Sequence, residues 1–217
     1  DLVMKLIEDT EFLVIDFETI TPRGRSPEPI EVGILRIKQN KIDSKASIDW
    51  LIKPPEGLHL THFDTLQTGI TERDLINGIE ARRAMKIIDK SCSKKDYVFI
   101  AQNAKYEANI LSYYTDECEG IARTPMIDTI LLAKHIFPKL ANYKLDTLAS
   151  TLKLKIPENR HRALADCFLT AEVFLKLIEL HKKENKLTNL DELLNIAKIK
   201  TKYSQPKQLK LSDFIEL

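Results

Sequence analysis

Two acids stand at the end of an apolar run near the start of the chain. Asp16 and Glu18 close the run 11–18, in which β-branched Val14 and Ile15 favour a strand. Residues two apart on a strand point to the same face, about 6.6 Å apart along the backbone. Two carboxylates on one face repel each other, and a pair of divalent metal ions is the most economical counterion for them. By itself the pattern is weak, because acids at a strand end often simply reach solvent.

A histidine and a third acid are spaced around the start of the clearest helix in the sequence. Pro157 ends the preceding segment, His161 lies in the next loop, and the apolar stripe of a helix runs over 163–181. Asp166 falls in the first turn, where the helix macrodipole favours its charge. On its loop His161 is free to approach whatever the acids bind. In isolation it is equally compatible with a cap or a surface group.

A fourth acid lies on a helix that follows a buried strand. The run 97–101 is short and continuously apolar, as expected of a strand that is covered on both faces. It leads to a helical segment over 106–114, and the first turns after the strand carry Asn103 and Glu107. Alone, Glu107 has the properties of an ordinary exposed helical glutamate.

The elements that must position these residues alternate along the chain. Strands are expected over 11–18, 30–37 and about 47–53 as an antiparallel meander, and Pro54-Pro55 ends the third. The expected helices are a short one from Thr71 and others over 81–89, 106–114, 129–137, 145–151 and 163–181, with a last short one ending near Ala197. A meander followed by alternating strands and helices predicts an α/β or α+β domain of three layers.

The composition changes after His181, where a polar linker begins. We therefore expect one domain over residues 1–181 and an extension over 182–217. The extension contains a short helix and a lysine-rich stretch, and an apolar-acidic segment over Leu211–Leu217 follows that stretch. The extension is equally compatible with a linker to a further domain, an arm that folds back over the sheet, or a segment that docks on a partner.

The composition excludes several classes of protein. Hydrophobic residues make up 43% of the chain and charged residues 30%, which fits a domain with a full core. We expect no membrane span, no secretory signal and a reducing, cytoplasmic setting, since the 3 cysteines form no metal or disulfide spacing. A net charge of +1 gives no global basic field, so nucleic-acid contacts would depend on local clusters: Arg23 with Arg25, Arg82 with Arg83, Arg160 with Arg162, and the lysines of the tail.

The candidate residues form an ordered series: Asp16-x-Glu18, then Asn103 and Glu107 at a helix start, then His161-x₄-Asp166. With this order the chain resembles the DEDDh exonucleases, the family of the proofreading epsilon subunit of bacterial DNA polymerase III and of RNase T, over 11–180. Further segments are similar to motifs of the family: Gly69-Ile70-Thr71, Ile127-Asp128-Thr129 with Leu132-Ala133, and Leu145-Asp146-Thr147-Leu148.

The resemblance implies a ribonuclease H-like α/β fold, a mixed central sheet of an antiparallel meander plus parallel strands, flanked by helices. It assigns Asp16, Glu18 and Asp166 to the binding of two Mg²⁺ or Mn²⁺ ions, with Asp16 bridging both and Glu107 as the fourth acid. It assigns His161 the role of general base toward the attacking water. The implied reaction releases nucleoside 5′-monophosphates from the 3′ end of single-stranded DNA or RNA.

The resemblance also implies residues that hold the substrate. Phe17 and Thr19 flank the acids and are expected to contact the terminal nucleotide through backbone and ring, although a core position suits Phe17 equally well. Asn103 matches a near-constant asparagine of the family and is expected to anchor the backbone around the site.

Three positions depart from the family pattern. Glu107 stands where the family usually has aspartate, Gln102 where it commonly has histidine, and Thr68 where it often has histidine. Glutamate keeps the charge but reaches about 1.5 Å farther. These departures leave open an alternative, a catalytically weakened domain of the same fold that binds nucleic acid or protein. A further alternative is a proofreading subunit that associates with a DNA polymerase.

Overall fold

A six-stranded sheet forms the centre of the protein in the computed structural model, which describes residues 5–92, 95–185 and 189–200. In spatial order its strands are β4 (Ile79–Glu80), β3 (Lys41–Lys53), β2 (Glu28–Lys38), β1 (Phe12–Ile20), β5 (Val98–Ala101) and β6 (Met126–Asp128). Strands β1 to β3 pair antiparallel as a meander, whereas β5 pairs parallel with β1, and β6 parallel with β5. The mixed sheet therefore has the composition that was expected.

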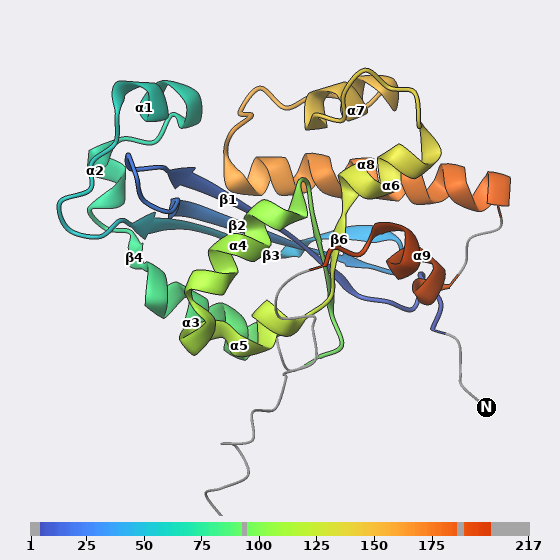
Figure 1. The fold of residues 1–217 in the computed structure, drawn as a ribbon, viewed down its shortest axis with the longest axis horizontal. Helices are drawn as coiled ribbons and strands as arrows, with labels where there is room; N and C mark the ends of the chain where they lie inside the picture. The colour runs from blue at the N-terminus through green and yellow to red at the C-terminus, as the bar shows by residue number, and fades with distance from the viewer. Residues whose placement is uncertain (1–4, 93–94, 186–188, 201–217) are drawn as a thin grey trace, which may run out of the picture.

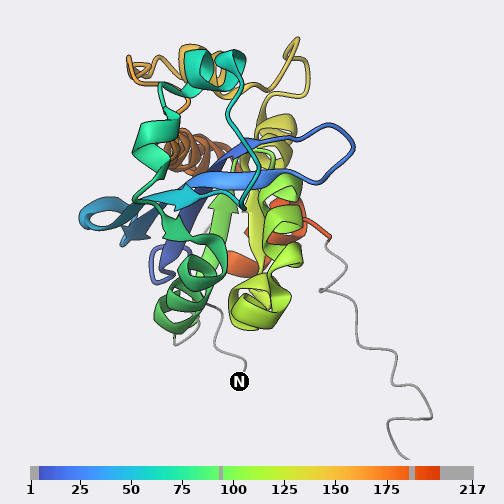
Figure 2. The ribbon, with the colours of Figure 1, turned by 90° about the vertical axis from the view of Figure 1, so that its left-hand side faces the viewer.

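Helices cover both faces of the sheet and complete three layers (Figures 1 and 2). On one face lie α6 (Thr129–Ile136), α7 (Leu145–Thr151), α8 (Ala163–Asn185) and α9 (Leu190–Ala197). On the other lie α3 (Ala81–Cys92), α4 (Ala104–Tyr113) and α5 (Thr115–Arg123). Two short helices, α1 (His62–Thr68) and α2 (Glu72–Leu75), follow the meander. The predicted three-layer α/β architecture is confirmed.

Both faces of strand β1 are buried, and its side chains alternate between the two faces. Phe12 and Val14 pack in the core under α8, while Leu13, Ile15 and Phe17 pack on the opposite face under α3 and α4. Since every second residue shares a face, Asp16 and Glu18 continue the row of Phe12 and Val14 toward α8. On this face of the strand, two apolar residues are thus followed by two acids that point toward the start of α8.

Several elements differ from the sequence-based expectation. Strand β3 begins at Lys41, ahead of the expected start near Ser47, and α4 begins at Ala104. Strands β4 and β6 and helices α1 and α5 were not expected. Strand β6 has 3 residues and β4 has 2, which are too short for a periodic pattern to emerge. Helix α5 is interrupted by non-helical backbone at Cys118, which disrupts its periodicity.

The chain remains packed on the domain beyond residue 181. Helix α8 continues to Asn185, and Leu190, Leu193 and Ala197 of α9 lie in the same core as α8. The boundary at 181 stays a prediction, and the tail 201–217 lies outside the described residues. None of the helices in the described ranges has the length and apolar character needed to cross a bilayer.

Candidate active site

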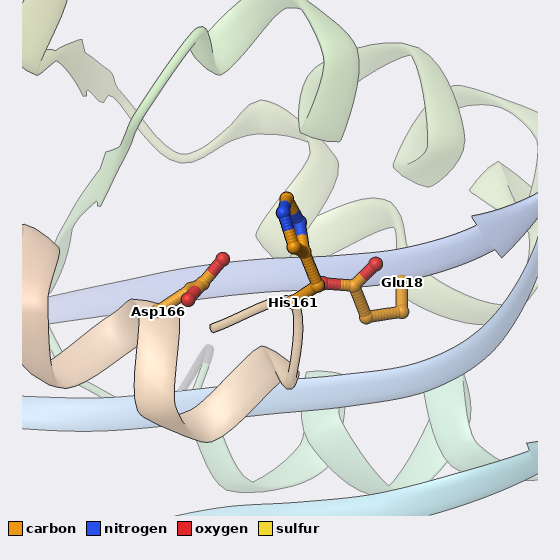
Figure 3. A group of neighbouring side chains, drawn as sticks. All are labelled: Glu18, His161 and Asp166. Atoms are coloured by element: carbon orange, nitrogen blue, oxygen red, sulfur yellow. The ribbon is translucent and has the colours of Figure 1, made fainter. Parts of the chain in front are cut away.

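Three chain segments far apart in sequence meet at one end of the sheet. The end of β1 brings Glu18, the loop before α8 brings His161, and the first turn of α8 brings Asp166 (Figure 3). One ligand atom from each of these residues lies within 4.8 Å of the others, a spacing that suits a metal ion. The structure therefore brings together the two motifs that the sequence placed more than a hundred residues apart.

Asp16 and Glu107 border this group from the interior. Helix α4 carries Glu107 inward, where its side chain is 3% exposed rather than solvated. Burial, followed by the charges of Glu107 and Asp166, raises the pKa of Asp16 well above its usual value. Burial also raises the pKa of Glu107, although hydrogen bonds from its own backbone and that of Phe17 oppose the shift. All four acids expected at the site thus act on one another electrostatically.

The pKa values of Glu18 and Asp166 are raised as well. Burial, then the charges of Asp166 and Glu31, raise the pKa of Glu18 to about 7. Burial raises the pKa of Asp166 too, against the opposing effect of Arg160. Burial, with the neighbouring carboxylates at Asp16 and Glu18, therefore disfavours the ionised forms of these acids more than the charge of Arg160 favours them.

The carboxylate oxygens fit divalent cations. Glu107 Oε2 is buried and has no hydrogen-bond partner among the residues that the structure describes, whereas Asp166 Oδ1 contacts Nη1 of Arg160. Buried acids normally receive such bonds, so their absence calls for an outside partner. Mg²⁺ and Mn²⁺ prefer hard oxygen ligands of this kind. Arg160 is the nearest protein cation, forming ion pairs with Asp166 and with Asp146.

Helix α4 is aimed at the site by a tight turn after β5. Asn103 has φ of 64°, a left-handed conformation that asparagine adopts more readily than most residues. The backbone N–H of Asn103 donates to Asp128 Oδ1 at 3.2 Å, and Ile130 N–H donates to the same oxygen at 2.8 Å. Asp128 therefore joins the starts of α4 and α6, a role that its position at the end of β6 did not reveal.

Gln102 has a supporting role in this turn. Its Nε2 donates to the carbonyl oxygen of Tyr143 at 2.8 Å, and its Oε1 accepts from the hydroxyl of Thr129. The side chain therefore links β5 to α6 and to the loop before α7. At this departure from the family pattern, both the N–H and the oxygen of the half-buried Gln102 amide have a hydrogen-bond partner.

The expected substrate-binding residues occupy different surroundings. Phe17 is 5% exposed and its ring packs with Leu13 and Ile15 in the core, on the face opposite the acids, which favours the core alternative for the ring. The hydroxyl of Thr19 lies 2.5 Å from that of Tyr106 and is half-buried. Asn103 is exposed. Their contact with a nucleotide stays a prediction.

An open cleft of about 800 Å³ adjoins the acids. Its lining includes Asp16, Asp166 and His161 together with the basic side chains of Lys134, Lys144 and Arg160. Two of the three arginine pairs expected to meet phosphate have members engaged with acids: Arg82 pairs with Glu117, and Arg160 and Arg162 pair with Asp166 and Glu31. The lysines of the cleft were not singled out in the sequence.

Comparisons with known proteins agree with this geometry. The family described as Exonuclease matches residues 13–174. The chain is 31% identical over 170 residues to the PolC-type DNA polymerase III of Caldanaerobacter subterraneus subsp. tengcongensis, covering 78% of this chain and 12% of that polymerase. It is 33% identical over 187 residues to the PolC-type enzyme of Thermotoga maritima, covering 85% of this chain and 13% of that protein. The chain thus spans about an eighth of the length of these relatives.

Solved structures share the fold. The nuclease domain of 3′hExo, described as a DEDDh family member bound to rAMP, has a TM-score of 0.65 at 16% identity and covers 82% of this chain and 94% of that one. Exonuclease X in complex with 5′ overhanging duplex DNA has a TM-score of 0.64 at 21% identity and covers 85% and 98%. These likenesses confirm the expected ribonuclease H-like fold.

Proposed function

Because the chain belongs to the DEDDh exonuclease family, we propose that it is a divalent-metal-dependent enzyme that removes nucleotides from the 3′ end of single-stranded DNA or RNA. The observation that carries this proposal is the cluster of acids beside His161, in which Glu107 Oε2 is buried without a hydrogen-bond partner among the described residues. A domain that only binds nucleic acid has no physical need for carboxylates held this close together.

The chain's own residues account for the chemistry as follows. Asp16, Glu18 and Asp166 would hold two Mg²⁺ or Mn²⁺ ions with Glu107 beside them, and the bound ions supply positive charge to the phosphate and acidify water. His161 accepts the proton of the attacking water near neutral pH. The water oxygen bonds to phosphorus as the bond to the preceding 3′ oxygen breaks, so a nucleoside 5′-monophosphate leaves.

The cleft supports a single strand as the substrate. Lys134 and Lys144 line the same cleft as the acids, where they can neutralise backbone phosphates. We expect Asn103, which lines the cleft, and Thr19, which follows Glu18 on β1, to contact the terminal nucleotide. The near-neutral net charge of +1 concentrates this attraction in the cleft rather than over the whole surface.

Digestion of 5′-labelled DNA and RNA oligonucleotides tests the proposal, with Mg²⁺ or Mn²⁺ and with Asp16→Ala as the inactive variant. A ladder shortened from the 3′ end, lost in Asp16→Ala and kept in the exposed control Asp9→Ala, is expected. Binding of the oligonucleotides without shortening under either metal would favour the alternative of a weakened binding domain.

We further propose that the domain proofreads for a polymerase in a reducing compartment such as the cytoplasm. The identity to PolC-type polymerases supports the partner, and three buried cysteines outside any disulfide suit the compartment. Faster removal of a mismatched 3′ nucleotide than of a paired one in a primer–template is the expected result. Equal rates would count against proofreading.

A further inference from the structure

A second buried glutamate lies next to the acid cluster and has no part in the chemistry above. Glu31 on β2 is 0% exposed and is paired across the strands with Glu18. Its carboxylate accepts from Arg162 Nη2 at 2.6 Å and from Arg162 Nε at 2.9 and 3.2 Å. The backbone N–H of Ala163 donates to the same carboxylate at 2.8 Å. We call this group of Glu31, Arg162 and Ala163 the β2–α8 clamp.

In the β2–α8 clamp, a side chain from outside the helix caps the N-terminus of α8. The first N–H groups of a helix have no partner within it and normally bond to a side chain just ahead of the helix. Arg162 precedes Ala163 here and has no acceptor for them. Glu31, from a strand more than a hundred residues earlier, accepts the first of these N–H groups instead. The charge on Glu31 also suits the positive end of the helix dipole.

Close contact between two backbone segments, β2 and the start of α8, fixes the same part of the structure. A Cβ added at Gly33 would lie 2.5 Å from the carbonyl carbon of Ala163 and 2.6 Å from the nitrogen of Leu164, so no side chain fits between β2 and the start of α8. Gly33 pairs across the strands with Asp16, just as Glu31 pairs with Glu18. Each metal-binding acid of β1 therefore has a neighbour on β2 that fixes α8.

The β2–α8 clamp restricts the backbone next to His161. Its φ of 63° is left-handed, a conformation that costs histidine free energy and persists only where the surroundings impose it. Among the described residues no hydrogen bond holds its imidazole, so the backbone decides where the ring lies. His161 directly precedes Arg162, and Asp166 lies one turn beyond Ala163.

We propose that Glu31 and Arg162 are positioning residues that hold His161 against the carboxylates, an inference that rests on the proposed function. An ion pair between a buried carboxylate and a partly exposed guanidinium contributes little net stability compared with apolar residues of similar volume, so stability alone does not explain it. A fixed fork between guanidinium and carboxylate restricts direction as well as distance, which is what a general base requires.

Glu31→Gln tests this inference in a double-mutant cycle with His161→Ala. Glutamine keeps the shape but has a single acceptor oxygen, so it cannot accept from the Arg162 guanidinium and from the Ala163 N–H on separate oxygens as Glu31 does. We expect kcat to fall by about 10–10²-fold with KM little changed. In the His161→Ala background the same change is expected to cost less than about 3-fold, because the group it positions is gone. An equal loss in both backgrounds would show a merely structural role and overturn the inference.

Two further variants keep the test sound. Arg162→Lys retains the charge without the fork, lies partly at the surface, and should follow the same pattern if Glu31→Gln does not fold. Asp43→Asn is the matched control, since it removes a similar pair with Arg36 (2.6 and 3.2 Å) between β2 and β3 and should leave kcat unchanged.

A readout without catalysis separates this inference from the proposed function. In the substrate-free protein the ring ¹H–¹³C signal of His161 should move and broaden in Glu31→Gln, while that of the exposed His59 stays in place. A wild-type protein that shortens no oligonucleotide would refute the proposed function, and the His161 spectrum would still decide on the clamp. An unmoved His161 signal would overturn it.

Discussion

Two buried glutamates on either side of the site differ in what holds them. Glu31 receives hydrogen bonds from a guanidinium and a helix N–H, and both of its oxygens are used. Glu107 is almost as buried, yet its Oε2 has no partner in the described part of the chain, and burial raises its pKa. A buried acid that the protein itself satisfies supports structure, whereas one that it leaves unsatisfied indicates a partner from outside. The predictions below test that distinction.

We expect the largest loss of activity from a substitution of Asp16, whose carboxylate interacts with all three of the other acids. Asp16→Asn keeps the size of the side chain but removes the charge nearest the other acids, and activity should fall by about 10³-fold or more, since several kcal/mol of charge stabilisation depend on the bound ions. Steady-state digestion of a labelled oligonucleotide measures it. Asp9→Asn, on the exposed surface, is the control, and comparable activity in the two variants would contradict the role of Asp16.

His161→Ala should have the next largest effect. We expect turnover to slow by about 10²–10⁴-fold with little loss of substrate affinity, because a general base acts on the transition state. Single-turnover rates and binding to a labelled oligonucleotide separate the two quantities. His59→Ala controls for loss of an imidazole, and a His161→Ala enzyme as active as the wild type would exclude the general-base role.

Substitutions of Glu107 sharpen the contrast with Glu31. Glu107→Gln removes the unsatisfied charge and should lower activity by about 10–10³-fold, whereas Glu107→Asp restores the residue usual in the family and should stay within about 10-fold of the wild type. Activity measured over a range of Mg²⁺ and Mn²⁺ concentrations would reveal altered metal preference. An inert wild type with an active Glu107→Asp would show that the longer acid has disabled the site.

The smallest effect is a pH dependence of stability. Burial raises the pKa of Glu18 from 4.5 to about 7, so the folded protein favours its protonated form. Without metal, stability should therefore decline as pH rises from about 4.5 to about 7. Glu18→Gln, which mimics the protonated acid, should melt several degrees above the wild type at pH 8 and close to it at pH 5, at about 2–4 °C per kcal/mol.

Thermal unfolding followed by circular dichroism in the presence of a chelator measures this difference. Added Mg²⁺ should raise the melting temperature of the wild type more than that of Glu18→Gln at pH 8. A gap between the two proteins that does not change with pH would contradict the assignment of the shift to Glu18.

Local patterns in the sequence were sufficient for much of the site. Alternation along β1 places Asp16 and Glu18 on one face, and the apolar stripe of α8 places Asp166 in its first turn. The order of these motifs predicted the family and the fold, both of which are confirmed. Such features depend on the periodicity of a strand or a helix, which a chain carries within a few residues.

The tertiary structure decided what lies between those motifs. Glu107 had the pattern of an exposed helical glutamate, and only the turn at Asn103 and the packing of α4 bury it beside Asp16. Glu31 and Arg162 are 131 positions apart, and no local pattern links them. The sequence alone determined which residues could do the chemistry, because residue type and period are local. Which of them meet, and what holds them there, depends on packing and hydrogen bonds across distant segments, so only the folded chain contains that information.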